Sequence, residues 1–301
     1  MKLLPLPLPL PPLLSRLPRP PRLSSALLGA TVLELAVLAG HLAVYPFGLT
    51  PERRPPTRPA GTEPGSGGAT ALPATATTVA APPPVVLLHG FVDNRSVFLL
   101  LRRALIRNGH DHGHHRHRHL ESLNYSPLTR DIRAAAGLLG RHVEEICART
   151  GHHRVDVVGH SLGGLIARYY VQRLGGDRRV RTLVTLGTPH GGTAVAPGAG
   201  IHPIVRQMRA GSSVIEELRA PAPGCRTRFV SFWSELDQVM VPAETACVDH
   251  PDLDAVNVRV TGIGHLALPV HPTVAAAIRE ALDAPVTGED TAPADGAASV
   301  A

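Results

Sequence analysis

Ser161 has the clearest chemical setting in this sequence. It is the centre of Gly159-His160-Ser161-Leu162-Gly163, a G-x-S-x-G pentapeptide. The run 154–158 before it is rich in β-branched residues, and the stretch 165–170 after it favours a helix. A chain that turns sharply from strand to helix around a serine needs small residues two positions before and after it, because the backbone is crowded there. The pattern therefore predicts a nucleophilic serine raised above the carboxyl ends of the strands.

A serine nucleophile needs a general base, and the base needs a group that fixes its tautomer. Downstream of Ser161, an apolar run at 229–233 precedes Asp237, and a second run at 256–260 precedes His265. Both residues thus follow the carboxyl end of a predicted strand, where open α/β sheets place their active sites. We predict a triad of Ser161, Asp237 and His265, in the chain order nucleophile, acid, histidine.

Other residues compete for the acid and base roles, because the chain has 17 histidines and 24 carboxylates. Glu235 shares the loop of Asp237. Three more carboxylates lie in the next connection: Asp249, Asp252 and Asp254. His250 and His271 flank His265, but neither directly follows a predicted strand. Position relative to the strands therefore favours Asp237 and His265.

The chemistry also requires backbone donors for a developing negative oxygen. The run 84–88 is short and apolar, as expected of a buried parallel strand, and ends in His89-Gly90-Phe91. We predict that the amide of Phe91 and the amide of Leu162, which follows the nucleophile, form the oxyanion hole. Residues beside these motifs are the candidates for the substrate pocket: His89, Gly90, His160, Pro189 and His190.

From residue 84 onward, apolar runs alternate with helical patterns. The runs predict strands at 84–88, 120–125, 154–158, 180–186, 227–233 and 256–260, and the periodicity predicts helices at 96–107, 130–149 and 162–174. This alternation indicates an α/β fold with a mostly parallel sheet flanked by helices. The segment 194–219 either flanks the acyl pocket as a small cap or covers the sheet as a helix, and the second interpretation is preferred.

The motifs at 88–91, 159–164 and 188–193, together with the Asp237 and His265 loops, resemble those of α/β-hydrolase lipases and esterases. The resemblance is to bacterial triacylglycerol lipases with a minimal core, and it covers 84–284. It implies hydrolysis of carboxylic esters, acylglycerol-type lipids above all, through an acyl-enzyme on Ser161 and without a cofactor. The alternatives are a thioesterase or acyltransferase with the same triad, and a non-catalytic binding protein of this fold. The intact order of the triad argues against the last of these.

The first 83 residues differ in composition from the rest. Residues 1–25 form a Pro/Leu-rich tail, 26–49 are mostly apolar, and 50–83 are predicted to be a disordered linker, like the tail at 285–301. The apolar segment is long enough to span a bilayer. Glu34 would cost about 2.5–3.5 kcal/mol at its centre, which neighbouring Leu and Val residues offset by about 0.3–0.6 kcal/mol each.

We expect an uncleaved membrane anchor in preference to a cleaved signal peptide, because bulky residues at 44–47 follow the apolar run where a small-residue cleavage site is required. The predicted location is the cell membrane, through 26–49 and with the catalytic domain extracytoplasmic, or outside the cell as a secreted enzyme. The net charge of +6 does not indicate a nucleic-acid partner, because seven basic and three acidic residues lie in the first 84 and aromatic residues are only 3%. The sequence does not fix an oligomeric state.

Three cysteines are too few for a disulfide scaffold or a zinc site of usual spacing. Cys225 and Cys247 lie on either side of the run that leads to Asp237, so a bridge between them is predicted to stabilise that loop by about 3 kcal/mol. Cys147 would remain a buried thiol. The histidine-rich stretch 110–119 is interpreted as an expanded surface loop, and no metal site is predicted.

Overall fold

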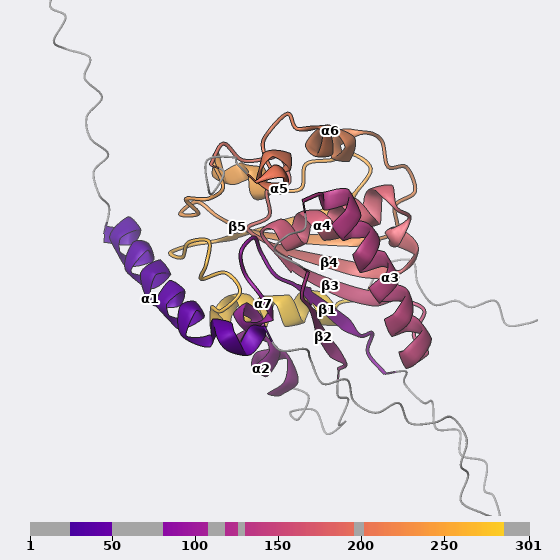
Figure 1. Ribbon diagram of the computed structural model, residues 1–301, viewed down its shortest axis with the longest axis horizontal. Coiled ribbons are helices and arrows are strands. Elements are labelled where there is room, and N and C mark those ends of the chain that lie inside the picture. The colour runs from indigo at the N-terminus through magenta and orange to yellow at the C-terminus, as the bar shows by residue number, and fades with distance from the viewer. Residues whose placement is uncertain (1–24, 50–80, 108–117, 126–129, 196–201, 286–301) are drawn as a thin grey trace, which may run out of the picture.

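The computed structural model describes residues 25–49, 81–107, 118–125, 130–195 and 202–285 (Figure 1). Within these segments six parallel strands form one sheet in the order β2-β1-β3-β4-β5-β6. The strands are β1 (Val85–Leu88), β2 (Leu120–Leu123), β3 (Val155–His160), β4 (Val180–Leu186), β5 (Arg228–Ser234) and β6 (Asp254–Val260). The predicted α/β fold is confirmed, and each strand overlaps the range predicted for it.

Helices cover both faces of the sheet (Figure 1). The described α-helices are α1 (Ser25–Gly48), α2 (Leu99–Arg107), α3 (Ile132–Thr150), α4 (Leu162–Arg173), α5 (Pro203–Gln207), α6 (Ser213–Arg219) and α7 (Pro272–Asp283). The turn Arg95–Phe98, a short 3-10 helix, leads into α2. The segment 194–219 therefore holds two short helices, and their apolar residues are buried in the core on the side of α3 and α4.

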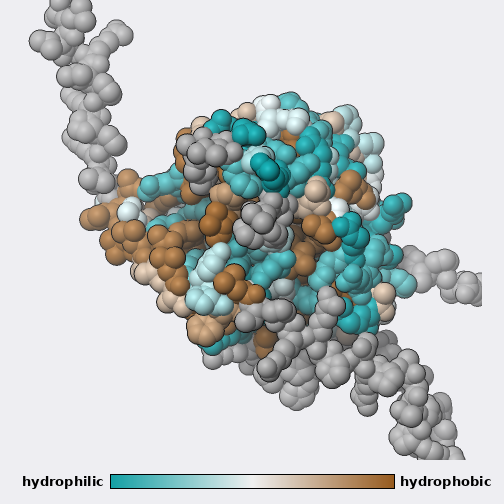
Figure 2. Space-filling view, in the orientation of Figure 1, coloured by the Kyte–Doolittle hydropathy of each residue, from teal (hydrophilic) through white to brown (hydrophobic). Residues whose placement is uncertain are grey.

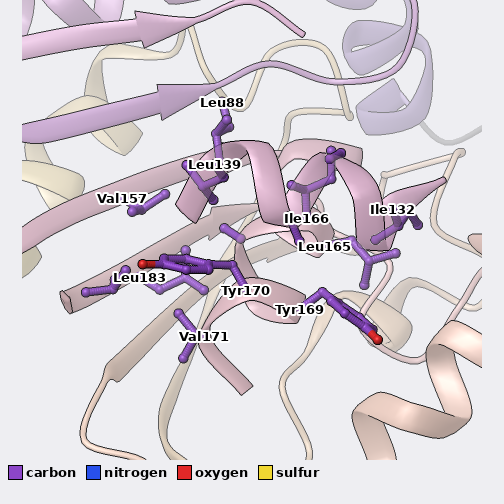
Figure 3. Packing of buried hydrophobic residues seen from close by; sticks show 14 of the residues in the cluster. Leu88, Ile132, Leu139, Val157, Leu165, Ile166, Tyr169, Tyr170, Val171 and Leu183 are labelled. Atoms are coloured by element: carbon purple, nitrogen blue, oxygen red, sulfur yellow. The ribbon is translucent and has the colours of Figure 1, made fainter. Parts of the chain in front are cut away.

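Successive residues of β1 point to opposite faces of the sheet, as the period of two in a strand requires. Val86 and Leu88 pack with residues of α3 and α4, whereas Val85 and Leu87 pack with residues of α2 and α7. Figure 3 shows the first of these two layers, in which Leu139 and Ile166 lie among other buried apolar side chains. Burial on both faces explains why β1 is a continuous apolar run and not an alternating one.

The direction of winding reverses between β1 and β3. After β1 the chain adds β2 on one side, and then returns to place β3, β4, β5 and β6 in turn on the other side. In open α/β sheets such a reversal leaves a crevice at the carboxyl ends of the two central strands, because the connections leave in opposite directions. The loops after β1 and β3 therefore meet at this edge of the sheet.

Helix α1 coincides with the predicted apolar segment 26–49 and is, among the described residues, the one helix long and apolar enough to cross a membrane. Figure 2 shows apolar residues along the outer side of α1, at the left edge of the molecule. The tails predicted at 1–25 and 285–301, the linker predicted at 50–83 and the histidine-rich loop at 110–119 lie largely outside the described residues.

Candidate active site

Ser161 occupies the turn between β3 and α4. Its backbone has φ 52° and ψ −120°, a conformation that costs a non-glycine residue roughly 1–3 kcal/mol. The surrounding glycines permit the turn, since a Cβ at Gly159 would lie 2.5 Å from the Cα of Gly164. Leu162 is the first residue of α4, so its N–H is one of the donors that a helix leaves without an intrahelical acceptor.

Gly163→Ala is expected to destabilise the protein, although alanine is normally favoured over glycine in a helix. The added Cβ would lie 2.5 Å from the carbonyl oxygen of His89 and closer still to that of Leu88, so α4 must move away from β1. We expect the free energy of unfolding to fall by about 1–3 kcal/mol. In the control Gly137→Ala, in α3, the Cβ meets nothing within 4 Å, and the free energy of unfolding should rise by about 0.4–1 kcal/mol. Urea denaturation of both variants measures this contrast, and two effects of the same sign would contradict it.

His265 and Asp237 are joined by a hydrogen bond of 2.7 Å between Nδ1 and Oδ2. Because an ionised carboxylate only accepts, Nδ1 carries the proton and Nε2 keeps a lone pair. The second carboxylate oxygen of Asp237 accepts the amides of Val239 and Met240, at 2.9 and 3.0 Å. Both side chains are buried. The loop after β5 thus fixes the carboxylate that orients the imidazole.

The competing residues are engaged elsewhere. Glu235 forms an exposed ion pair with Arg259 of β6. His250 lies with Nε2 at 3.1 Å from the carbonyl of Ala220, and His271 is the residue that precedes α7. Among these candidates, Asp237 is the residue that is hydrogen-bonded to His265.

The charge environment of His265 favours its protonated form. Burial alone would lower the pKa of His265, but the charge and hydrogen bond of Asp237, together with the charges of Glu34 and Asp93, raise it above the ordinary value. The neighbouring ring of His160 lies 4.8 Å away between centroids and donates from Nε2 to the carbonyl of His265 at 3.2 Å. Burial holds the pKa of His160 well below its usual range, so this ring stays neutral.

The loop after β1 packs against the nucleophile. A Cβ at Gly90 would lie 3.3 Å from the Cβ of Ser161, so the backbone that carries Phe91 approaches the serine closely. The hydroxyl of Tyr125 donates to the carbonyl of His89 at 2.5 Å, and the carbonyl of Gly90 lies 2.9 Å away. Sequence reasoning did not identify Tyr125, which lies two residues after β2 and fixes this loop.

A cavity of about 200 Å³ is bounded by both Ser161 and His265. Three of the predicted pocket residues line it, namely Gly90, His160 and Pro189. The full lining is Gly90, Phe91, Val92, Asp93, His160, Ser161, Pro189, Thr193, Val195, Met208, Val239, Met240, His265 and Leu266. Most of these side chains are apolar, and Val195 and Met208 come from the segment that was considered as a small cap.

His89 and His190, which were also predicted as pocket residues, do not line this cavity. The ring of His89 is buried and stacks on Tyr125 at 4.2 Å between centroids, and burial lowers its pKa to about 4. His190 is also buried, with Nε2 at 2.9 Å from Oγ1 of Thr185 in β4. Stacking on Tyr125 holds the ring of His89, and the contact with Thr185 holds the ring of His190.

Two residues next to the site were missed by sequence reasoning. Gly187 directly follows β4 and has φ +52°, and a Cβ there would lie 2.9 Å from both Asp237 Oδ2 and His265 Nδ1. Thr188 donates from its hydroxyl to the carbonyl of Ser161 at 3.0 Å. A glycine immediately after a predicted strand was the available signal, since such a position often permits close approach of other groups.

The predicted bridge between Cys225 and Cys247 is not formed, and all three cysteines are free thiols. Cys225 precedes the start of β5, whereas the residue before Cys247 accepts a hydrogen bond from Ser231, in the middle of that strand. Six residues separate Cys225 from Ser231, and a strand rises about 3.3 Å per residue. The two cysteines therefore lie at different levels along the sheet.

The sequence profile of the palmitoyl protein thioesterase family matches residues 84–223. Among solved structures, lipase B of Aspergillus fumigatus is similar at 16% identity and a TM-score of 0.59, over 69% of this chain and 54% of that one. The mature form of the Bacillus licheniformis lipase BlEst2 is similar at 16% identity and a TM-score of 0.55, over 67% of this chain and 92% of that one. The lin2722 gene product of Listeria innocua is similar at 16% identity and a TM-score of 0.54, over 69% of this chain and 96% of that one.

The similarity to these solved structures agrees with the six-stranded parallel sheet described above. At this level of identity the solved structures establish the fold, and the family profile matches the first part of the same region. The chain therefore has the α/β-hydrolase fold, which it shares with the lipases among these solved structures.

Proposed function

We propose that the protein is a serine-dependent carboxylic ester hydrolase that acts on acylglycerol-type lipids through an acyl-enzyme on Ser161. One observation carries the proposal: His265, which is hydrogen-bonded to Asp237, borders the same cavity as a serine held in a strained strand-to-helix turn. This set of groups is sufficient for acyl transfer from an ester.

In the proposed reaction, the hydroxyl of Ser161 attacks the ester carbonyl and His265 Nε2 takes its proton. The oxyanion accepts hydrogen bonds from the amides of Phe91 and Leu162. As the tetrahedral intermediate collapses, the C–O bond to the alcohol breaks and the alcohol leaves with the proton from His265. Water then attacks the acyl-serine by the same route and releases the acid. Throughout, Asp237 stabilises the imidazolium.

The cavity supports an acyl substrate because its walls are largely apolar. Its volume of about 200 Å³ is below the roughly 300–1,000 Å³ that is usual for ligand pockets, so part of a long acyl chain would extend beyond it. Val92 at the rim is 64% exposed and Val195 is 42% exposed, which offers apolar surface to such an extension.

We also propose that the enzyme works at a membrane, with the catalytic domain extracytoplasmic. The supporting feature is α1, whose large apolar side chains remain exposed: Leu28, Val32, Leu35, Leu38, Leu42 and Phe47. A contiguous apolar surface of this kind is suited to lipid (Figure 2).

Thioester hydrolysis is the second candidate, and the match to the palmitoyl protein thioesterase family is the observation that favours it. The same triad and oxyanion donors serve both reactions, because only the leaving atom changes from oxygen to sulfur. Substrate preference therefore separates the two candidates, and the arrangement of catalytic groups does not.

The proposal is tested with the full chain in detergent micelles. We expect turnover of a p-nitrophenyl ester series from acetate to palmitate, and covalent labelling of Ser161 by a fluorophosphonate, located by peptide mass spectrometry. Palmitoyl thioester is assayed in parallel. Turnover of thioesters alone would establish the second candidate. A folded protein that hydrolyses neither class and leaves Ser161 unlabelled would contradict both.

A further inference from the structure

Helix α1 does not stand apart from the catalytic domain. The less exposed positions of the helix recur every three or four residues and include Ala30, Leu33, Val37, His41 and Tyr45. This spacing forms one stripe along a helix. Leu33 and Val37 pack against the core cluster that contains residues of α2 and α7. One side of α1 is thus docked on the domain, and the opposite side carries the exposed apolar residues.

The end of α1 is also held by the domain. The carbonyl oxygen of Gly48 accepts the side-chain amide of Asn124 at 2.7 Å, and that of Tyr45 accepts the side-chain amide of Asn94 at 2.9 Å. A Cβ at Gly48 would overlap the Asn94 side chain. The last carbonyl groups of a helix have no intrahelical partners, so these bonds satisfy acceptors that would otherwise be left without one.

Glu34, the carboxylate of this helix, lies on the docked side and reaches the loop of His265. Its Oε2 accepts the amide of Leu266 at 2.8 Å, and its Oε1 accepts the amide of Ala267 at 2.9 Å. The fit is close, because a Cβ at Gly264 would lie 2.7 Å from the Glu34 carboxyl carbon. Both carboxylate oxygens are therefore used by the two residues that follow His265.

These contacts hold the backbone of His265 from two directions. Glu34 accepts hydrogen bonds from the amides of the two residues that follow His265. The ring of His160 donates to the carbonyl of His265 at 3.2 Å. Hydrogen bonds from amides to an ionised carboxylate are shorter and stronger than neutral ones. Precise placement of a catalytic base matters, since a misplacement of about 1 Å can lower a rate roughly a hundredfold.

We propose that α1 is a component of the active site and that Glu34 is a positioning residue for His265. This inference rests on the proposed function, because it concerns the same histidine. It also assigns the two sides of α1: the side with Glu34 serves the catalytic loop, and the apolar side faces lipid beside the pocket. In a helix that spans a bilayer, the carboxylate of Glu34 would be exposed to hydrocarbon. Here backbone amides bind it.

The charge of Glu34 gives the inference a signature in the pH dependence. His265 is faced by the carboxylates of Asp237, Glu34 and Asp93 and by the ring of His160. His41 of α1 faces Asp93 and His160. The charge of Glu34 contributes to the raised pKa of His265. Removing that charge should therefore move the acid limb of kcat/KM to lower pH, because the base remains unprotonated further into the acid range.

The test compares Glu34→Gln with Glu144→Gln in the full chain, on p-nitrophenyl butyrate in detergent micelles. Glutamine keeps the size of Glu34 but replaces one acceptor with a donor, so one loop amide loses its partner. We expect kcat per fluorophosphonate-titrated site to fall at least about tenfold with KM little changed, and the acid limb to move to lower pH. Glu144 lies in α3 and forms an exposed ion pair with Arg179, so its variant should keep the wild-type kcat and acid limb.

A third variant separates charge from position. Glu34→Asp keeps the charge but is one methylene shorter, so it should lower kcat while the acid limb stays near that of the wild type. The inference would be overturned if Glu34→Gln and Glu34→Asp both kept the wild-type kcat and acid limb per titrated site. Failure of the proposed function itself appears separately, as turnover that persists in Ser161→Ala.

Discussion

Ser161→Ala is expected to lower kcat for ester hydrolysis by about a millionfold, to near the blank rate. In the proposed mechanism the serine attacks the ester and then carries the acyl group that water removes, so its loss eliminates the covalent route and does not merely weaken a contact. Activity that remains would come from the oxyanion donors and substrate binding, roughly 10³–10⁴-fold over water. The measurement is single-turnover and steady-state hydrolysis of p-nitrophenyl butyrate by the purified full chain.

A matched serine variant shows that the loss is specific. Ser96 lies in the 3-10 turn before α2, and its buried hydroxyl has no hydrogen-bond partner. Ser96→Ala should therefore fold and turn over like the wild type, because it removes a hydroxyl that makes no such bond. If Ser161→Ala kept more than about a thousandth of the wild-type kcat, with labelling by fluorophosphonate at another residue, the assignment of the nucleophile would be wrong.

The strands and the elbow were accessible from sequence because their causes are local. The run 154–158 must form a buried strand, and glycines at 159 and 163 are required wherever a serine turns directly into a helix. The structure shows the reason in atomic terms, since β1 leaves no space for a side chain at Gly163. The positions of Asp237 and His265 along the chain then led to their selection. Each follows the carboxyl end of a predicted strand, and these ends lie at the same edge of a parallel sheet.

Features that depend on contacts distant in sequence were not accessible. Glu34 was interpreted as a cost to membrane insertion, yet its partner Leu266 is 232 residues away, and nothing near residue 34 indicates the pairing. The same reason accounts for His89, whose ring stacks on Tyr125 from the segment after β2. The cysteine bridge was wrong because spacing along the chain does not give the level of each residue along β5.

The interpretation of α1 changes with its contacts. As a sequence, 26–49 is an anchor that could be removed without consequence for the chemistry. In the structure, the helix contributes a carboxylate to the loop after His265, and the pocket residue Leu266 is itself bound by that carboxylate. In the function that we propose, one helix combines attachment to lipid with placement of the general base. Detaching α1 should impair both functions together.

Asp237→Asn is expected to lower kcat about 10⁴-fold while leaving KM within a few fold. The carboxylate accepts the Nδ1 proton of His265 at 2.7 Å and so keeps Nε2 free to act as the base. An asparagine amide directed at Nδ1 as a donor would stabilise the opposite tautomer, with the proton on Nε2. It would also remove the negative charge that contributes most to raising the pKa of His265. The measurements are kcat and KM on p-nitrophenyl butyrate, together with thermal unfolding.

Glu235→Gln is the matched control for the acid. Glu235 lies two residues before Asp237 in the same loop, but its carboxylate pairs with Arg259 at the surface. An exposed ion pair contributes only about 0–1 kcal/mol, so this variant should keep the wild-type kcat and nearly the wild-type stability. The reverse pattern, in which Glu235→Gln is inactive and Asp237→Asn is active, would show that the loop rearranges in solution and that Glu235 supplies the acid. Because the two substitutions alter charge equally within one loop, a difference between them isolates the hydrogen bond to His265 as the cause.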